Sequence, residues 1–129
     1  MKKDITIPQV EGVNVVVLYE EEQWVVHVLN QNDFDLTNVL INSKGYGVID
    51  GEEKKTSVLR HMIELVPGQS AAAVETINED VFCLNNEYWV SYFANGQMFD
   101  KKFVFVPDTI STDNLTTIPV IDKKGILHS

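Results

Sequence analysis

The chain has 129 residues, of which 44% are hydrophobic and 22% charged, and this predicts a single globular domain over residues 1–129 and argues against disorder. The formal net charge of −9, with no local stripe of Lys or Arg, disfavours nucleic acid as a partner. No segment reaches the ~18 apolar residues of a membrane-spanning helix, and no signal-peptide pattern follows Lys2 and Lys3, so we expect a cytoplasmic protein without membrane contact.

The first predicted hairpin follows an extended lead-in at residues 1–11. Residues 13–19 are rich in Val, which favours a strand because β-branched side chains lose rotamers in a helix. The acidic run from Glu20 to Glu22 reverses the chain, and residues 24–29 return as the second strand. Apolar residues occupy both faces of these strands, so some must lie outside the core. We expect either the C-terminal tail or a partner to cover them.

The next stretch joins two strands through a polar loop. Residues 30–35 are rich in Asn and Asp, and the third strand opens with the sequence LTNV. Asp50-Gly51 then predicts a tight turn between arms at residues 36–49 and 52–66, since this dipeptide tolerates positive φ angles. A strand, a polar loop and a second strand in this order resemble the centre of an immunoglobulin-like sandwich.

Residues 56–66 fit two periodicities. Helical spacing relates Leu59, Met62, Ile63 and Val66, whereas strand alternation relates Leu59, His61, Ile63 and Leu65. We predict a strand, because the turn chemistry on both sides is typical of hairpins and Pro67-Gly68 ends the segment. Residues 70–77 are expected to form another strand, and residues 78–87 a crossover that holds a helical turn.

An aromatic hairpin at residues 88–105 gives the clearest local signal. Asn95-Gly96 predicts a two-residue turn, which pairs Ala94 with Gln97 and fixes the register of both strands. The predicted core face carries Tyr88, Val90 and Tyr92 opposite Phe99, Lys101 and Phe103, with Phe105 extending it. The other face carries Trp89, Ser91 and Phe93 opposite Met98, Asp100 and Lys102. Solvent or a partner must cover this second face.

The remaining residues, 107–129, are expected to form an edge segment or tail along the sandwich. Pro107 and Pro119 lie in this stretch, and proline suits an edge better than a sheet interior because it has no N–H to donate.

We predict no enzyme activity and no cofactor, because GxSxG, GxxxxGK[ST] and HExxH motifs are all absent. The sequence SKGYG at residues 43–47 lacks the spacing of a phosphate loop. Its glycines are better explained by a bulge or bend in a strand.

We also predict no metal site. His27, His61 and His128 do not have metal-ligand spacing to one another or to Cys83, and we expect His27 to be half-exposed and Cys83 buried. Asn32, Asp33 and Asp35 offer oxygen ligands of the kind that calcium prefers. We interpret them as turn residues, because the EF-hand pattern is absent.

The full length resembles a family of small acidic bacterial proteins. The elements NNEYWVSY at residues 85–92 and SKGYG at residues 43–47 carry the resemblance. Some members of that family are labelled as a phenylalanyl-tRNA synthetase subunit, but no class II synthetase motif and no basic tRNA-facing surface accompany the label here. The resemblance implies no active residues.

These features predict an all-β fold, an immunoglobulin-like antiparallel β-sandwich of about seven strands. The functional hypothesis is a non-enzymatic interaction or structural module that binds a protein partner or self-associates, forming a homodimer. Its binding residues are Trp89, Phe93, Met98 and Tyr46. One alternative is a small-ligand or glycan binder that uses Tyr46, Trp89 and the loop at residues 32–35. Another is an accessory subunit of a larger enzyme such as a tRNA synthetase.

Overall fold

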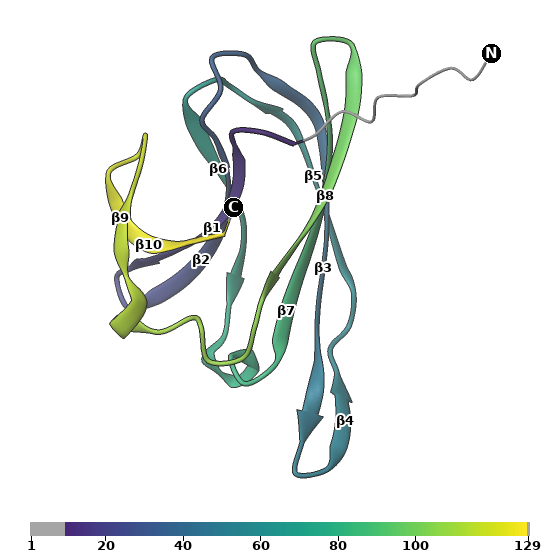
Figure 1. Cartoon of the computed structure of the whole chain (residues 1–129), viewed down its shortest axis with the longest axis vertical. Helices are drawn as coiled ribbons and strands as arrows, with labels where there is room; N and C mark the ends of the chain where they lie inside the picture. Colours follow the sequence, from purple (N-terminus) through teal and green to yellow (C-terminus); the bar gives the residue numbers. More distant parts are fainter. Residues whose placement is uncertain (1–9, 129) are drawn as a thin grey trace, which may run out of the picture.

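The computed structural model describes residues 10–128 as two antiparallel β-sheets packed face to face (Figure 1). Sheet A contains, in spatial order, β6 (Ser70–Ile77), β2 (Gln23–Asn30), β1 (Val13–Glu20), β10 (Lys123–His128) and β9 (Thr116–Ile118). Sheet B contains β4 (Glu52–Lys55), β3 (Leu36–Ile49), β7 (Asn85–Ala94) and β8 (Gln97–Phe105), and β5 (Leu59–Val66) also pairs with β3. Two short 3-10 turns, η1 (Glu79–Val81) and η2 (Thr112–Asn114), lie in the connections. Within the described part of the chain, no helix is long and apolar enough to cross a membrane.

The strand pairing confirms the predicted sandwich. β2 pairs with β1 and β6 in one sheet, and β3, β7 and β8 are neighbours in the other. In the strand letters used for immunoglobulin-like sandwiches, β1–β2 corresponds to A–B and β2–β6 to B–E. Likewise, β3–β7 corresponds to C–F and β7–β8 to F–G. The predicted number of about seven strands is too low, for two reasons. The strand after the Asp50-Gly51 turn is interrupted, which divides it into β4 and β5, and the C-terminal residues add β9 and β10.

Two-residue turns set the register of three hairpins. Both central residues have positive φ in each turn: Glu21 (51°) and Glu22 (62°), Asp50 (53°) and Gly51 (79°), and Asn95 (51°) and Gly96 (76°). Turns of this kind match the right-handed twist of the strands that they join. Ala94 consequently pairs with Gln97, and Tyr88 pairs with Phe103, which confirms the register predicted for the aromatic hairpin.

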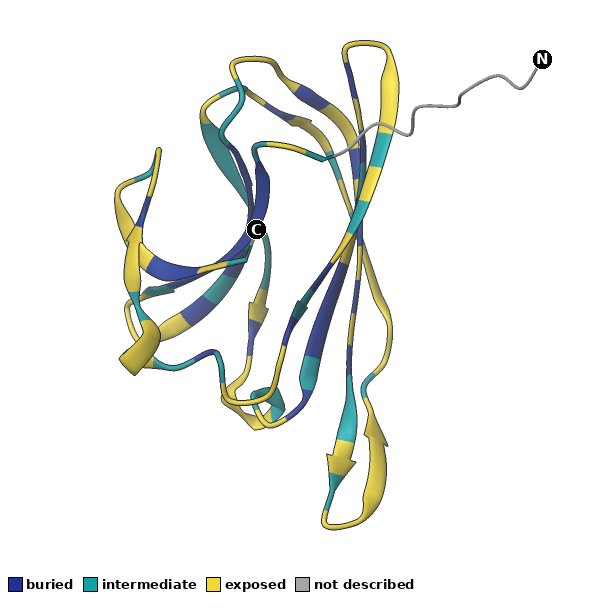
Figure 2. Cartoon of the chain, viewed as in Figure 1, coloured by how far each residue is buried: buried dark blue, intermediate teal, exposed yellow. Residues whose placement is uncertain are grey.

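The core lies between the two sheets (Figure 2). Tyr88, Val90, Tyr92 and Phe103 are buried there, as predicted, and Phe99 is half-buried with its ring stacked on Tyr92 at 5.3 Å between centroids. Sheet A contributes the facing residues Val13, Val15, Val17, Trp24, Val26 and Val28. Burial raises the pKa of Tyr92 to about 12, because the interior disfavours the charged phenolate.

The C-terminal strands extend sheet A and cover its outer face. Ile118 of β9 is fully buried and packs in a second apolar cluster with Val16, Leu18 and Leu29. The tail therefore covers the apolar residues that the first hairpin leaves outside the main core. Figure 1 shows β9 and β10 on the far side of the molecule from sheet B.

The position expected for the tail is only partly correct. β9 is an edge strand, but β10 pairs with both β1 and β9, so the predicted edge position is wrong for Lys123–His128. Pro107 and Pro119 both lie outside β10. Proline therefore removes no donor from this strand, and β10 can pair on both sides.

The chain between β4 and β5 leaves the sheet. Residues 56–58 are not in a strand, and the predicted strand at residues 56–66 is confirmed only from Leu59 onward. Thr56 partly replaces the missing pairing, because its amide donates to the Gly45 carbonyl at 2.9 Å and its Oγ1 accepts the Gly45 amide at 2.7 Å. A Cβ at Gly45 would lie 3.0 Å from the Thr56 methyl group, so this glycine gives Thr56 room. The bulge expected at residues 43–47 lies instead at Asn38, whose φ is 48°.

We expect Ile118→Ala to lower the free energy of unfolding by about 2–5 kcal/mol, because it opens a cavity between β9 and sheet A. Leu127→Ala is the matched control, since Leu127 lies on the neighbouring strand but is 38% exposed, and it should cost less than about 1 kcal/mol. Urea denaturation measures both changes. Equal effects of the two substitutions would contradict the packing described for the tail.

Candidate functional site

The four predicted binding residues lie on the outer face of sheet B, the surface turned away from sheet A. Trp89 and Phe93 alternate along β7 with the buried residues of the core face, and each is 43% exposed. Met98 of β8 pairs with Phe93 and is 57% exposed. Tyr46 of β3 joins this face through its hydroxyl, which donates to the Glu87 carboxylate at 3.3 Å. The tail does not cover these residues.

Three more exposed apolar side chains extend this patch across the sheet. Leu40 of β3 lies opposite Met62 of β5, and Leu65 of β5 lies opposite Thr37, which pairs with Phe93 on its other side. We define the apolar patch as the exposed residues Leu40, Met62, Leu65, Trp89, Phe93 and Met98. Its residues come from β5, β3, β7 and β8, with the polar Thr37 and Ser91 between them.

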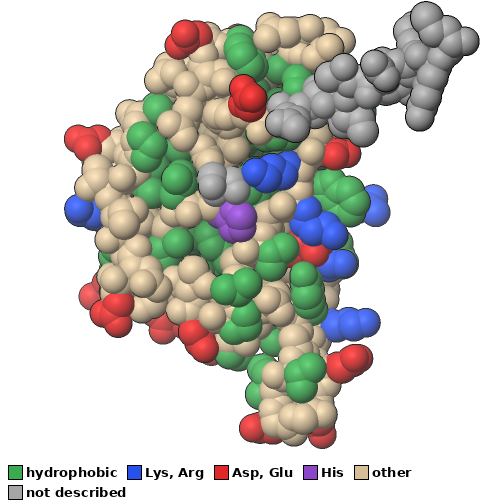
Figure 3. Space-filling view, viewed as in Figure 1, with side chains coloured by type: hydrophobic (Ala, Val, Ile, Leu, Met, Phe, Trp, Pro, Cys, Tyr) green, Lys and Arg blue, Asp and Glu red, His purple; other side chains and the backbone are tan. Residues whose placement is uncertain are grey.

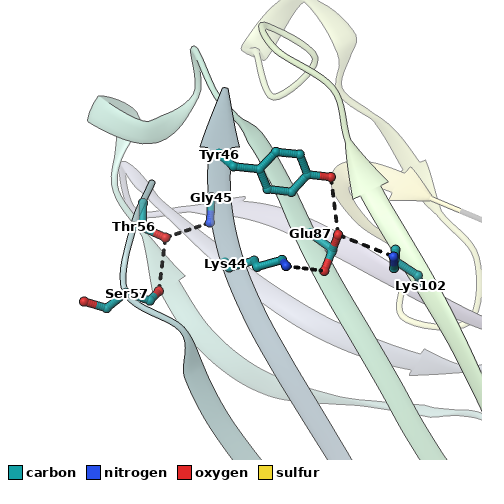
Figure 4. Close-up of polar contacts among 7 residues, drawn as sticks. All are labelled: Lys44, Gly45, Tyr46, Thr56, Ser57, Glu87 and Lys102. Carbon is teal, nitrogen blue, oxygen red and sulfur yellow. Dashed lines mark hydrogen bonds and ion pairs between the residues drawn. The ribbon is translucent and has the colours of Figure 1, made fainter. Parts of the chain in front are cut away.

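A polar network borders the apolar patch, with Glu87 at its centre (Figure 4). The Glu87 side chain is only 7% exposed. Its Oε2 lies 3.7 Å from Lys44 Nζ, and its Oε1 lies 3.9 Å from Lys102 Nζ. Lys102 also lies over the Trp89 ring, 5.1 Å from its centroid. The network therefore links Tyr46 at one end of the face to Trp89 in the apolar patch.

The ionised Glu87 affects the acidity of Tyr46. Partial burial raises the pKa of the Tyr46 phenol above its ordinary value of 10.0, and the Glu87 charge and hydrogen bond raise it further. A neighbouring negative charge and an acceptor for the phenolic proton both favour the neutral form. The phenol thus remains a hydrogen-bond donor in this network at neutral pH.

Basic side chains gather on sheet B although the protein is acidic. In the described chain the Lys and Arg residues of sheet A are Lys123 and Lys124, and those of sheet B are Lys44, Lys54, Lys55, Arg60, Lys101 and Lys102. Figure 3 shows most of the visible Lys and Arg side chains on one side of the molecule, with some acidic side chains among them and others spread around the outline. The same strands also carry Glu52, Glu53, Glu64, Glu87 and Asp100, so the strands of sheet B hold six basic and five acidic residues.

The loop at residues 32–35 has a structural role. Asp35 Oδ1 accepts the Gly68 amide at 3.0 Å, and Asp33 Oδ1 accepts from Gln69 Nε2 at 3.4 Å, so both carboxylates hold the turn between β5 and β6. Among the residues that the structure describes, no group of three or more His, Cys, Asp or Glu side chains is placed to hold a metal ion.

The glycan site suggested by the sequence is not assembled in the fold. The loop at residues 32–35 precedes β3, whereas Tyr46 lies near the other end of this strand. Tyr46 is ten residue steps along β3 from Leu36, a distance of about 33 Å at ~3.3 Å per residue. The loop therefore cannot bind the same small ligand as Tyr46 and Trp89.

His27 and Cys83, which are potential metal ligands by residue type, have different surroundings. His27 is half-buried, as predicted, and desolvation lowers the pKa of its imidazole. Cys83 is exposed rather than buried, because it follows η1 in the crossover instead of lying in a strand.

Glu87→Gln is expected to lower the pKa of Tyr46 toward 10.0, because it removes the negative charge that disfavours the phenolate. Residual burial should hold the pKa above that value. NMR titration of 13C-labelled tyrosine measures the change. Asp100→Asn, on the same face but without a contact to Tyr46, is the control. An unchanged Tyr46 pKa in Glu87→Gln would contradict the network.

Chelator is expected to leave the melting temperature unchanged, because the loop carboxylates already accept protein hydrogen bonds. A metal at a hundredfold excess over its dissociation constant would stabilise the fold by ~2.7 kcal/mol. Thermal unfolding with and without EDTA tests this. A fall of several degrees would show that the loop holds a cation.

Comparisons of this chain with protein-family models, with curated proteins and with solved structures give no match. The candidate surface is therefore defined by geometry alone: an exposed apolar patch on sheet B, bordered by the buried Glu87 and the two lysines that neutralise it.

Proposed function

We propose that this protein is a non-enzymatic interaction module that self-associates through the outer face of sheet B. The exposure of Trp89, Phe93 and Met98 on one continuous face carries this proposal. Large aromatic and Met side chains are enriched at protein interfaces, and contiguous apolar patches on a monomer commonly mark an interaction site. The tail covers the corresponding face of sheet A, which leaves this face as the larger apolar surface on a sheet.

The size of the face supports a dimer. Four strands at ~4.8 Å spacing and nine residues at ~3.3 Å give a face of about 19 by 30 Å, or about 570 Å² per copy. Two such faces would bury about 1,100 Å², which is close to the ~1,000 Å² that a specific interface needs. Burying ~300 Å² of apolar surface would contribute on the order of 7 kcal/mol before the cost of association is subtracted.

The charge distribution supports a second copy as the occupant. Lys44 and Lys55 lie toward one end of β3, and Asp33 and Asp35 lie in the loop at its other end. The end with the lysines also carries Glu52, Glu53 and Glu87, so its charge is mixed. A two-fold axis in the interface, perpendicular to the strands, would place Lys44 and Lys55 of each copy toward Asp33 and Asp35 of the other. Such an isologous arrangement satisfies both the apolar patch and the charges.

Trp89→Ser should weaken this dimer at least tenfold without loss of the fold, because the Trp89 side chain lies outside the core. Sedimentation equilibrium at micromolar concentration measures the association. Leu127→Ser is the matched control, since Leu127 is similarly exposed but lies on sheet A, and it should leave the dissociation constant unchanged.

A wild-type protein that remains monomeric at high concentration would overturn the proposal. Such a result would favour a different protein partner for the same face, as expected of an accessory subunit. Equal weakening by Trp89→Ser and Leu127→Ser would show that the dimer forms elsewhere.

A further inference from the structure

A cavity of about 230 Å³ lies between the two sheets, beside the interruption that separates β4 from β5. Its polar lining includes Ser43, Thr56, Glu75, Asn78 and Tyr88, together with Ser57, Thr76 and Asn86. Leu59, Ile77 and Val81 supply apolar walls. The cavity is separate from the outer face of sheet B, because Ser43 and Tyr88 point to the core side of their strands.

Glu75 of β6 provides the carboxylate of this cavity. Its Oε1 accepts two hydrogen bonds, from Ser43 Oγ at 2.7 Å and from His61 Nε2 at 2.9 Å. The Glu75 side chain is 15% exposed, and no hydrogen bond to Oε2 is formed by the described residues. The carboxylate is therefore held in one orientation, and one of its oxygens remains available to a ligand.

Tyr88 and Lys44 are the neighbours of Glu75 that decide the chemistry of the cavity wall. Burial raises the pKa of the Tyr88 phenol well above its ordinary value, and the negative charge of Glu75 raises it further. Tyr88 is thus a neutral aromatic wall in a region of low dielectric. Lys44 also borders the cavity, but its ammonium group lies on the outer face beside Glu87. Glu75 is therefore the carboxylate that lines this cavity, with His61 Nε2 at 2.9 Å as its neighbour outside the lining.

We propose that this cavity binds a small primary ammonium ion with an apolar body. The ammonium group would donate to Glu75 Oε2, and the apolar body would contact Leu59, Ile77 and the Tyr88 ring. The space equals that of about seven or eight waters at ~30 Å³ each, which suits a ligand with a few heavy atoms inside the pocket. This proposal is independent of self-association through sheet B.

The arrangement favours binding over catalysis. Ser43 donates to the Glu75 carboxylate and not to His61, so the pair does not form the Ser–His contact in which an imidazole takes the hydroxyl proton. A metal ion would need further ligands, and the described residues place no third His, Cys, Asp or Glu near this pair. An organic cation needs only one carboxylate and an apolar wall, which the cavity supplies.

The test uses 3-methylbutylamine, with the uncharged 3-methylbutanol of similar shape as the ligand control. Titration into 15N-labelled protein should shift the amide signals of Gly45, Glu75 and Asn78 with the amine and not with the alcohol. Glu75→Gln, which keeps both hydrogen bonds and the side-chain volume, should weaken amine binding at least tenfold. Glu64→Gln, an exposed carboxylate on β5, should leave binding unchanged.

Glu75→Asp provides a second variant that keeps the charge and moves it by one methylene group. It should bind the amine more weakly than the wild type while still preferring the amine to the alcohol. Equal binding of amine and alcohol, equal affinity of the wild type and Glu75→Gln, or amine-induced shifts confined to surface carboxylates would each overturn the proposal. Absence of any shift at millimolar amine would do the same.

Discussion

The Asn95-Gly96 turn determines which residues of sheet B are buried. Side chains alternate along a strand, so a shift of one residue between β7 and β8 would break the pairing of Tyr88 and Tyr92 with Phe103 and Phe99 on the core face. The two positive φ angles at this turn are set locally and define the register of the hairpin. Both the core and the outer face follow from this local constraint. Stability and surface chemistry therefore have the same structural origin in this hairpin.

Local turn chemistry also explains which features the sequence could predict. The positions of Trp89, Phe93 and Met98 follow from the turn, but Met62 does not. In the hairpin after Asp50-Gly51, Tyr46 of β3 pairs with Lys55 of β4. If the returning strand continued in this register without a break, Met62 would lie opposite the buried Val39. The interruption at residues 56–58 adds one residue, so Met62 pairs with Leu40 on the outer face instead. The side chain of Thr56 and the space at Gly45 stabilise this interruption. The two residues are 11 positions apart, so a local sequence pattern does not reveal their contact. The cavity beside Glu75 opens at the same place and was equally inaccessible to sequence reasoning.

The two sheets differ in how the apolar side chains on their outer faces are covered. Each sheet has apolar side chains on both faces, and only one face of each can join the common core. In sheet A the chain itself covers the excess, because Ile118 closes over Val16 and Leu18 and β10 extends the sheet. In sheet B the described chain has no equivalent segment, and charged side chains border the patch instead. A long-range pairing such as β1 with β10 joins residues near the two ends of the chain, which explains why edge and interior positions could not be assigned from composition.

The uneven distribution of charge gives the molecule an electric dipole moment. Six of the basic residues lie in the strands of sheet B, whereas most of the acidic side chains lie in loops and turns. A dipole of this kind orients a protein as it approaches another charged surface, before any contact is made. The encounter rate then depends on ionic strength, because the Debye length falls from about 30 Å at 0.01 M salt to about 8 Å at 0.15 M. The basic residues of this acidic chain would thus bias the direction of approach even where they form no contact in the final complex.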